Sequence, residues 1–198
     1  MQITDSLNLA IPFGNGLVAY HAPIDRAVYE ANYAVLHATL ATMSKRGVHY
    51  LRASGPSIAS LVLKDEAKRE AAERGEKVDS VALLGEIKRL TTVLSPSPSG
   101  YETLPVDVAL EQGKFDAEDW SELEASLVFF TCLVQTAKKS DRAIVANSAA
   151  SVMDGSITSS AITAYVASLQ ISTKVEPTAN LGSSPQPSDT SPAMGLPI

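Results

Sequence analysis

Apolar side chains recur along this chain at alternating spacings of four and three residues, the period of one face of an α-helix. A chain with several such stripes must bury them together, so we expect a mainly α protein built as a helical bundle. With 45% hydrophobic and 19% charged residues, 198 residues suffice for one core. The three clearest stripes are Tyr29, Tyr33, Leu36, Leu40 and Met43; Leu83, Ile87, Leu90 and Leu94; and Trp120, Leu123, Leu127, Phe130, Val134, Ala137 and Ile144.

Capping residues set the expected helix boundaries in the first half of the chain. Asp25 is placed to cap the first helix, and Gly47 is placed to stop it. A second helix is expected to start near residues 54–57 (SGPS) and to end at Gly75. Its second half, residues 64–74, is densely charged. We interpret that half as a solvated helix end, and a docking rod is the alternative.

The second half of the chain predicts two longer helices around a break. Ser80 can cap a helix that reaches Leu94, and residues 95–100 (SPSPSG) then form an internal linker within one domain. A short helix is expected over 106–112. Asp116 then opens the strongest predicted helix, which runs over 117–146.

Both ends of the chain differ from this helical pattern. Residues 7–21 predict an N-terminal β-hairpin, because two strand-like runs flank the turn residues PFGNG. Asp154 and Gly155 mark a turn, and a last short helix carries apolar residues over 162–169. Residues 171–198 are rich in Ser, Thr and Pro, so we expect a disordered C-terminal tail after a single domain over 1–170.

The residue types that carry chemistry do not form a recognisable site. His21, His37 and His49 lack a metal-ligand spacing. Cys132 lies in an apolar stretch, where a buried thiol is the expected state. The acidic run over 116–124 is explained by its position at a helix start. We therefore expect a protein that is not an enzyme and that uses no cofactor and no metal.

Charge and hydropathy narrow the expected partners and location. The net charge is −6 without a basic stripe, which argues against nucleic acid and against anionic lipid as partners. The longest apolar stretch, residues 127–134, is too short to span a membrane. The first residues lack a secretory signal pattern. We expect a soluble, intracellular protein.

One helix carries more apolar surface than a single stripe needs. Phe129 and Leu133 lie four residues apart on a face beside the main stripe of helix 117–146. They indicate either a helix buried on two sides or a partner-binding face. Phe129 and Leu133 are the candidate partner-binding residues.

Three stretches carry a resemblance to a known family. The hairpin followed by residues 22–30 (APIDRAVYE), and residues 104–110 (LPVDVAL) leading into 115–120 (FDAEDW), resemble tail assembly chaperones of long-tailed bacteriophages, siphovirus-like or Mu-like. The resemblance implies a non-catalytic protein of the host bacterial cytoplasm. Its implied partners are the tape-measure protein, which it coats, and the major tail protein, whose subunits it helps recruit.

Two other functions stay open at this stage. One is a virion structural protein, such as a tail or head-completion component. The other is a small phage regulator or inhibitor that binds a host protein. The heptad-like spacing over 117–146 also permits self-association.

Overall fold

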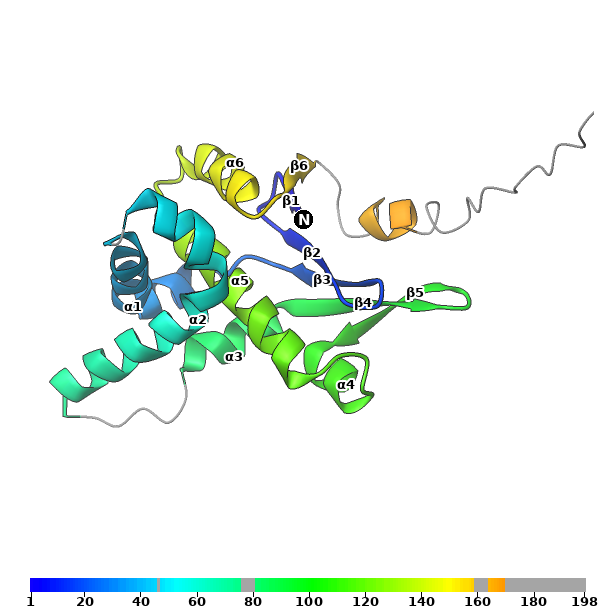
Figure 1. The fold of residues 1–198 in the computed structure, drawn as a ribbon, viewed down its shortest axis with the longest axis horizontal. Coiled ribbons are helices and arrows are strands. Elements are labelled where there is room, and N and C mark those ends of the chain that lie inside the picture. Colours follow the sequence, from blue (N-terminus) through cyan, green and yellow to red (C-terminus); the bar gives the residue numbers. More distant parts are fainter. Residues whose placement is uncertain (46, 76–80, 159–163, 170–198) are drawn as a thin grey trace, which may run out of the picture.

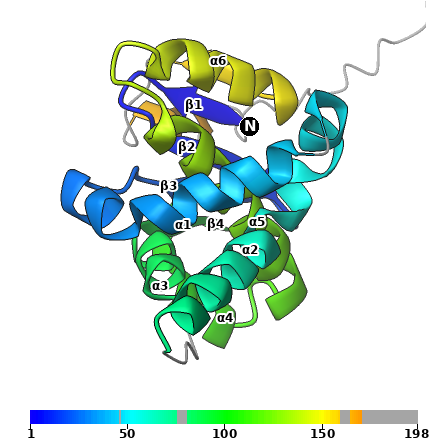
Figure 2. The ribbon, with the colours of Figure 1, turned by 90° about the vertical axis from the view of Figure 1, so that its left-hand side faces the viewer.

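The computed structural model describes the chain except residues 46, 76–80, 159–163 and 170–198. A six-stranded sheet lies beside a layer of helices (Figures 1 and 2). The strands are β1 (Gln2–Thr4), β2 (Leu9–Phe13), β3 (Leu17–His21), β4 (Thr91–Ser97), β5 (Gly100–Pro105) and β6 (Ser156–Thr158). The helices are α1 (Arg26–Ser44), α2 (Val48–Glu73), α3 (Ala82–Arg89), α4 (Val106–Glu111), α5 (Ala117–Thr136) and α6 (Arg142–Val152). Residues 164–169 form a further short helical segment.

The predicted hairpin over 7–21 is confirmed, but it is part of a larger sheet. Strands β2 and β3 pair antiparallel from Leu9–His21 to Phe13–Leu17. Asn15 and Gly16 take the positive φ that the turn requires, at 53° and 75°. The strand order is β5-β4-β3-β2-β1-β6, antiparallel except for the parallel pair of β1 and β6. The helices therefore pack on a sheet that is larger than the predicted N-terminal hairpin, and the predicted helical bundle is not confirmed.

The predicted linker over 95–100 is also wrong, because those residues belong to a second hairpin. Helix α3 ends at Arg89, and β4 begins at Thr91 and pairs with β3 as far as Leu94. Pro96 lies beyond that pairing and is opposite Tyr101 of β5 only, so β3 does not need the N–H that proline lacks. Leu94, predicted on a helix, is a buried strand residue.

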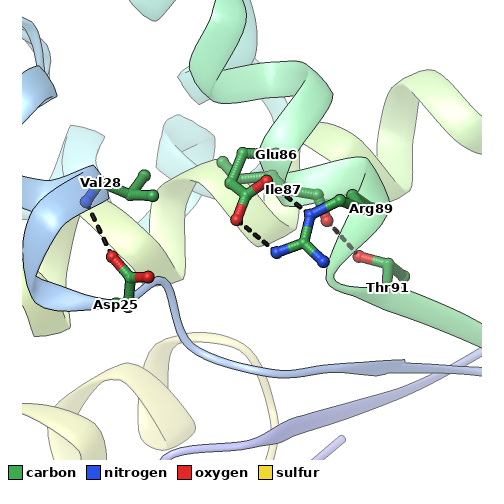
Figure 3. Close-up of polar contacts among 6 residues, drawn as sticks. All are labelled: Asp25, Val28, Glu86, Ile87, Arg89 and Thr91. Carbon is green, nitrogen blue, oxygen red and sulfur yellow. Dashed lines mark hydrogen bonds and ion pairs between the residues drawn. The ribbon is translucent and has the colours of Figure 1, made fainter.

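The first helix begins and ends as its capping residues predict. The Val28 N–H donates to Oδ1 of Asp25 at 2.8 Å (Figure 3), and the helix stops at Ser44, before Gly47. Helix α2 begins at Val48, earlier than expected, so that Pro56 lies inside it. The helix bends part-way along (Figure 1), as an internal proline favours. It ends at Glu73, just before Gly75.

The long helix predicted over 117–146 is in fact two helices. Helix α5 ends at Thr136, and α6 begins at Arg142 after a short loop and packs against α5. Ile144 therefore lies on α6 and does not continue the stripe of α5. The predicted short helix after residue 105 and the turn at Asp154 are both present. The tail over 171–198 and the cap at Ser80 lie outside the described residues.

The main core lies between the sheet and the helices, with α5 at its centre. Helix α5 contacts α1, α2, α3, α6 and β2. Its buried residues cover most of its circumference, since they include consecutive positions from Leu127 to Cys132. Helix α5 is thus buried on more than one side, one of the two alternatives that its apolar residues indicated, because neighbouring helices and the sheet both cover it.

Candidate functional site

An apolar groove opens where α5 lies between α2 and α6. Its volume is about 580 Å³. Helix α2 supplies one wall, α6 supplies the other, and the C-terminal half of α5 forms the floor. The lining residues are Leu51, Arg52, Phe129, Leu133, Ile144, Asn147, Ser148, Ser151 and Val152. Both predicted partner-binding residues line this one groove.

The two predicted residues differ in how far a partner can reach them. Phe129 is fully buried and packs against Gly55 of α2, so it is chiefly a core residue beneath the groove. Leu133 is half-buried and packs against the edge of the core. The structure thus brings Phe129 and Leu133 together in one groove. Leu133 is the one of the two that a partner could contact directly.

Ile144 is the groove residue that sequence reasoning missed. Its side chain is 68% exposed, which is unusual for a large aliphatic residue. The stripe analysis assigned it to the buried face of the long helix. The polar run Lys138–Asp141, which interrupts the apolar pattern, was the available signal that a second helix begins there.

The groove carries one charged side chain and several small polar ones. Arg52 is exposed at the α2 wall, and no carboxylate lines the groove. Asn147, Ser148 and Ser151 contribute small polar side chains from α6. The surface therefore offers aliphatic contact along its centre and hydrogen-bonding groups at one rim.

Two polar contacts fix the helices that form the groove. The Thr42 hydroxyl of α1 donates to Oε1 of Glu66 on α2 at 2.6 Å. Lys64 of α2 donates to Oε1 of Glu124 on α5 at 2.8 Å, and the Glu124 side chain is only 11% exposed. Both carboxylates are buried, so each needs its partner to offset the loss of hydration. The first contact joins α2 to α1, and the second joins α2 to α5.

The acidic run at the start of α5 has the structural role expected of it. Asp116 accepts hydrogen bonds from the N–H groups of Glu118 and Asp119, and the Asp119 side chain accepts from the Asp116 N–H. This reciprocal pair is a capping box. Glu124, further along, turns inward to Lys64. Asp116 and Asp119 thus cap the helix, and Glu124 joins α5 to α2.

A polar corner forms where α3, β4 and the start of α1 meet (Figure 3). Arg89 contacts both carboxylate oxygens of Glu86 at 2.7 Å, and this pairing holds the pKa of Glu86 below its usual range. The Thr91 hydroxyl donates to the Ile87 carbonyl at 2.7 Å. The Thr91 bond joins α3 to the first residue of β4, and the Arg89 pair lies within α3.

His21 is the unusual group at this corner. Because Thr91 donates to Ile87, its oxygen accepts from Nδ1 of His21 at 3.0 Å. Nε2 is buried and has no hydrogen-bond partner in the described part of the chain. Burial lowers the pKa of His21 from 6.5 to about 4. His21 is therefore a neutral core residue at neutral pH.

The remaining candidate chemistry is dispersed or buried. Cys132 is fully buried, which raises the pKa of its thiol to about 12. Across the described residues, no three His, Cys, Asp or Glu side chains gather as a metal ion would need. None of the described helices has an apolar stretch long enough to cross a bilayer.

Comparisons with known proteins add no assignment to this geometry. Nothing matches the chain among protein-family models, curated proteins or solved structures. The groove between α2, α5 and α6 is thus the feature from which a function can be argued.

Proposed function

We propose that this protein is a non-catalytic tail assembly chaperone of a long-tailed bacteriophage. In this role it binds the tape-measure protein in the host bacterial cytoplasm and helps recruit subunits of the tail tube. The identity of the partners rests on the resemblance of residues 22–30, 104–110 and 115–120 to that family. The observation that supports a binding role is the apolar groove over Phe129.

The groove suits one apolar face of a partner helix. An amphipathic helix binds through side chains spaced three and four residues apart, and it needs an apolar channel bounded by two walls. Leu133 at the floor and the exposed Ile144 on the α6 wall provide aliphatic contact of that kind. A tape-measure protein is long, helical and apolar, so covering such a stripe would keep it soluble.

Co-expression with the proteins encoded beside this chain tests the proposal. We expect affinity purification to recover a long helical protein that is soluble only when this chain is present. Ile144→Asp and Leu133→Asp should lower its recovery at least about tenfold, because a carboxylate would be desolvated in the interface. Leu61→Asp is the matched control, since Leu61 of α2 is 59% exposed and lies outside the groove.

Other recoveries would contradict the proposal. Equal recovery by Ile144→Asp, Leu133→Asp and Leu61→Asp would exclude the groove as the binding surface. Recovery of a host protein in place of tail proteins would favour a phage inhibitor. Stable presence of this chain in purified particles would favour a virion structural protein. Phe129→Asp is unsuitable here, because the buried position makes it a test of folding.

A further inference from the structure

The face of the sheet that points away from the main core is apolar at its centre. Ala10, Val18, Tyr20 and Leu94 form a buried cluster that is separate from the main core. They come from three neighbouring strands, since Ala10 lies opposite Tyr20 and Val18 lies opposite Leu94. Alternate residues of a strand point to opposite faces, so Leu9 and Ala19 join the main core instead.

The helical segment over 164–169 covers this cluster. Tyr165 is buried there, with its ring centroid 6.4 Å from that of Tyr20. Val166 and Leu169 pack against the same cluster. Figure 1 draws the segment (orange) beside β3 and β4, on the side away from α1 and α2. In the described part of the chain, no other helix contributes to this cluster.

The segment is too short to be stable by itself. Six residues allow few helical hydrogen bonds, and nucleation of an isolated helix is unfavourable. Its order therefore depends on the contacts of Tyr165, Val166 and Leu169 with the sheet. The rest of the fold does not depend on those contacts in the same way, because the main core is a separate cluster. Elements with few contacts of this kind open locally before the whole protein unfolds.

We propose that residues 164–169 are a releasable cover, an intramolecular contact that occupies an apolar sheet face and opens while the rest of the fold stays intact. Opening uncovers Val18, Tyr20 and Leu94 without disturbing α5. The covered sheet face shares no residue with the groove on the helical side.

Thiol labelling of the full-length chain tests the cover. Val18→Cys places a thiol of similar size beneath the cover, and the native Cys132 in the main core is an internal reference. We expect Cys at position 18 to react with a thiol reagent at least about tenfold faster than Cys132. The labelling rate at position 18 should change little at low urea concentrations. The labelling rate of Cys132 should instead rise with urea, because it depends on global unfolding. Leu94→Cys is a second reporter beneath the same cover.

A second substitution identifies the element that opens. Tyr165→Ser should accelerate labelling at position 18 about tenfold or more, because the segment loses buried aromatic surface. The labelling rate of Cys132 should stay unchanged. Ala167→Ser, at an exposed position of the same segment, should change neither rate. Equal rates and equal urea dependence at position 18 or 94 and at Cys132 would overturn the proposal. An unchanged rate in Tyr165→Ser would also overturn it.

Discussion

The ring of Phe129 on α5 lies directly over the Cα of Gly55 on α2. A Cβ at position 55 would meet Cδ2 of Phe129 at 2.9 Å and would lie closer still to Cε2. A glycine inside a helix costs about 1 kcal/mol relative to alanine. At this position the cost is offset, because the missing side chain lets two helices approach and bury a phenylalanine completely.

Gly55→Ala should therefore destabilise the protein by about 1–3 kcal/mol, since neither the backbone of α2 nor the buried ring can shift freely. Chemical denaturation gives the free energy of unfolding. Gly85→Ala on α3 is the matched control, because nothing lies within 4 Å of its added Cβ. The control should be neutral or stabilising by up to about 1 kcal/mol. Equal effects at the two glycines would contradict the close contact with Phe129.

The burial of His21 predicts a stability that depends on pH. Its pKa is about 4 in the folded protein and 6.5 as the ordinary value, so the unfolded chain binds more protons between those limits. The neutral His21 side chain makes its full contribution to stability above pH 6.5. As the pH falls from 6.5 to 4, the free energy of unfolding decreases by about 3 kcal/mol in all. Denaturation curves across this range measure the change.

The variant His21→Gln isolates this effect from the titration of carboxylates. The difference in unfolding free energy between wild type and variant should shrink as the pH falls from 6.5 to 4. His37→Gln is the control, because His37 is exposed on α1, with its ring beside Tyr29. A constant difference for His21→Gln over the whole range would show that His21 titrates normally.

The contact of Lys64 with Glu124 should be worth more than a surface ion pair. Lys64→Met leaves the buried Glu124 carboxylate without its donor, so we expect a loss of about 1–3 kcal/mol. Arg26→Met removes a pair whose side chains are 80% and 58% exposed, and it should cost less than about 1 kcal/mol. Adding Glu124→Leu to Lys64→Met should restore part of the loss. No recovery in the double variant would mean that packing, and not the unpaired charge, dominates.

The capping box at the start of α5 gives a fourth prediction. Asp116→Ala removes the acceptor of two N–H groups and should destabilise the protein by about 1 kcal/mol. Asp116→Asn keeps a capping oxygen and should lose only a small part of that stability. Thermal unfolding of the two variants provides the comparison. Equal melting temperatures would contradict a capping role for Asp116.

Sequence patterns predicted the elements whose signals are local. Asp25 and Asp116 begin their helices as capping residues should, and Asn15 and Gly16 form the predicted turn. The second hairpin was missed because Leu83, Ile87, Leu90 and Leu94 happen to keep a helical period across the end of α3. The β-branched run Thr91–Val93 was the competing strand signal.

The groove could be predicted only in part, for a related reason. The excess of apolar residues around Phe129 correctly indicated a helix with neighbours on several sides. Ile144 could be placed on the groove wall only once the chain was known to reverse after Thr136, and that reversal depends on packing between α5 and α6. Tertiary contacts of this kind leave little trace in the spacing of residues.

The parallel pairing of β1 with β6 has a consequence for the order of events during synthesis. Gln2 lies opposite Ser156, so β1 finds this neighbour only after the chain has grown to β6, the last strand of the described part. At about 5–20 residues per second, translation separates the two by roughly 10–30 seconds. Throughout that interval the outer edge of β1 is an open strand edge, which other nascent chains can join. Strand β6 thus covers an edge of β1 that is open to other chains while the intervening residues are being synthesised.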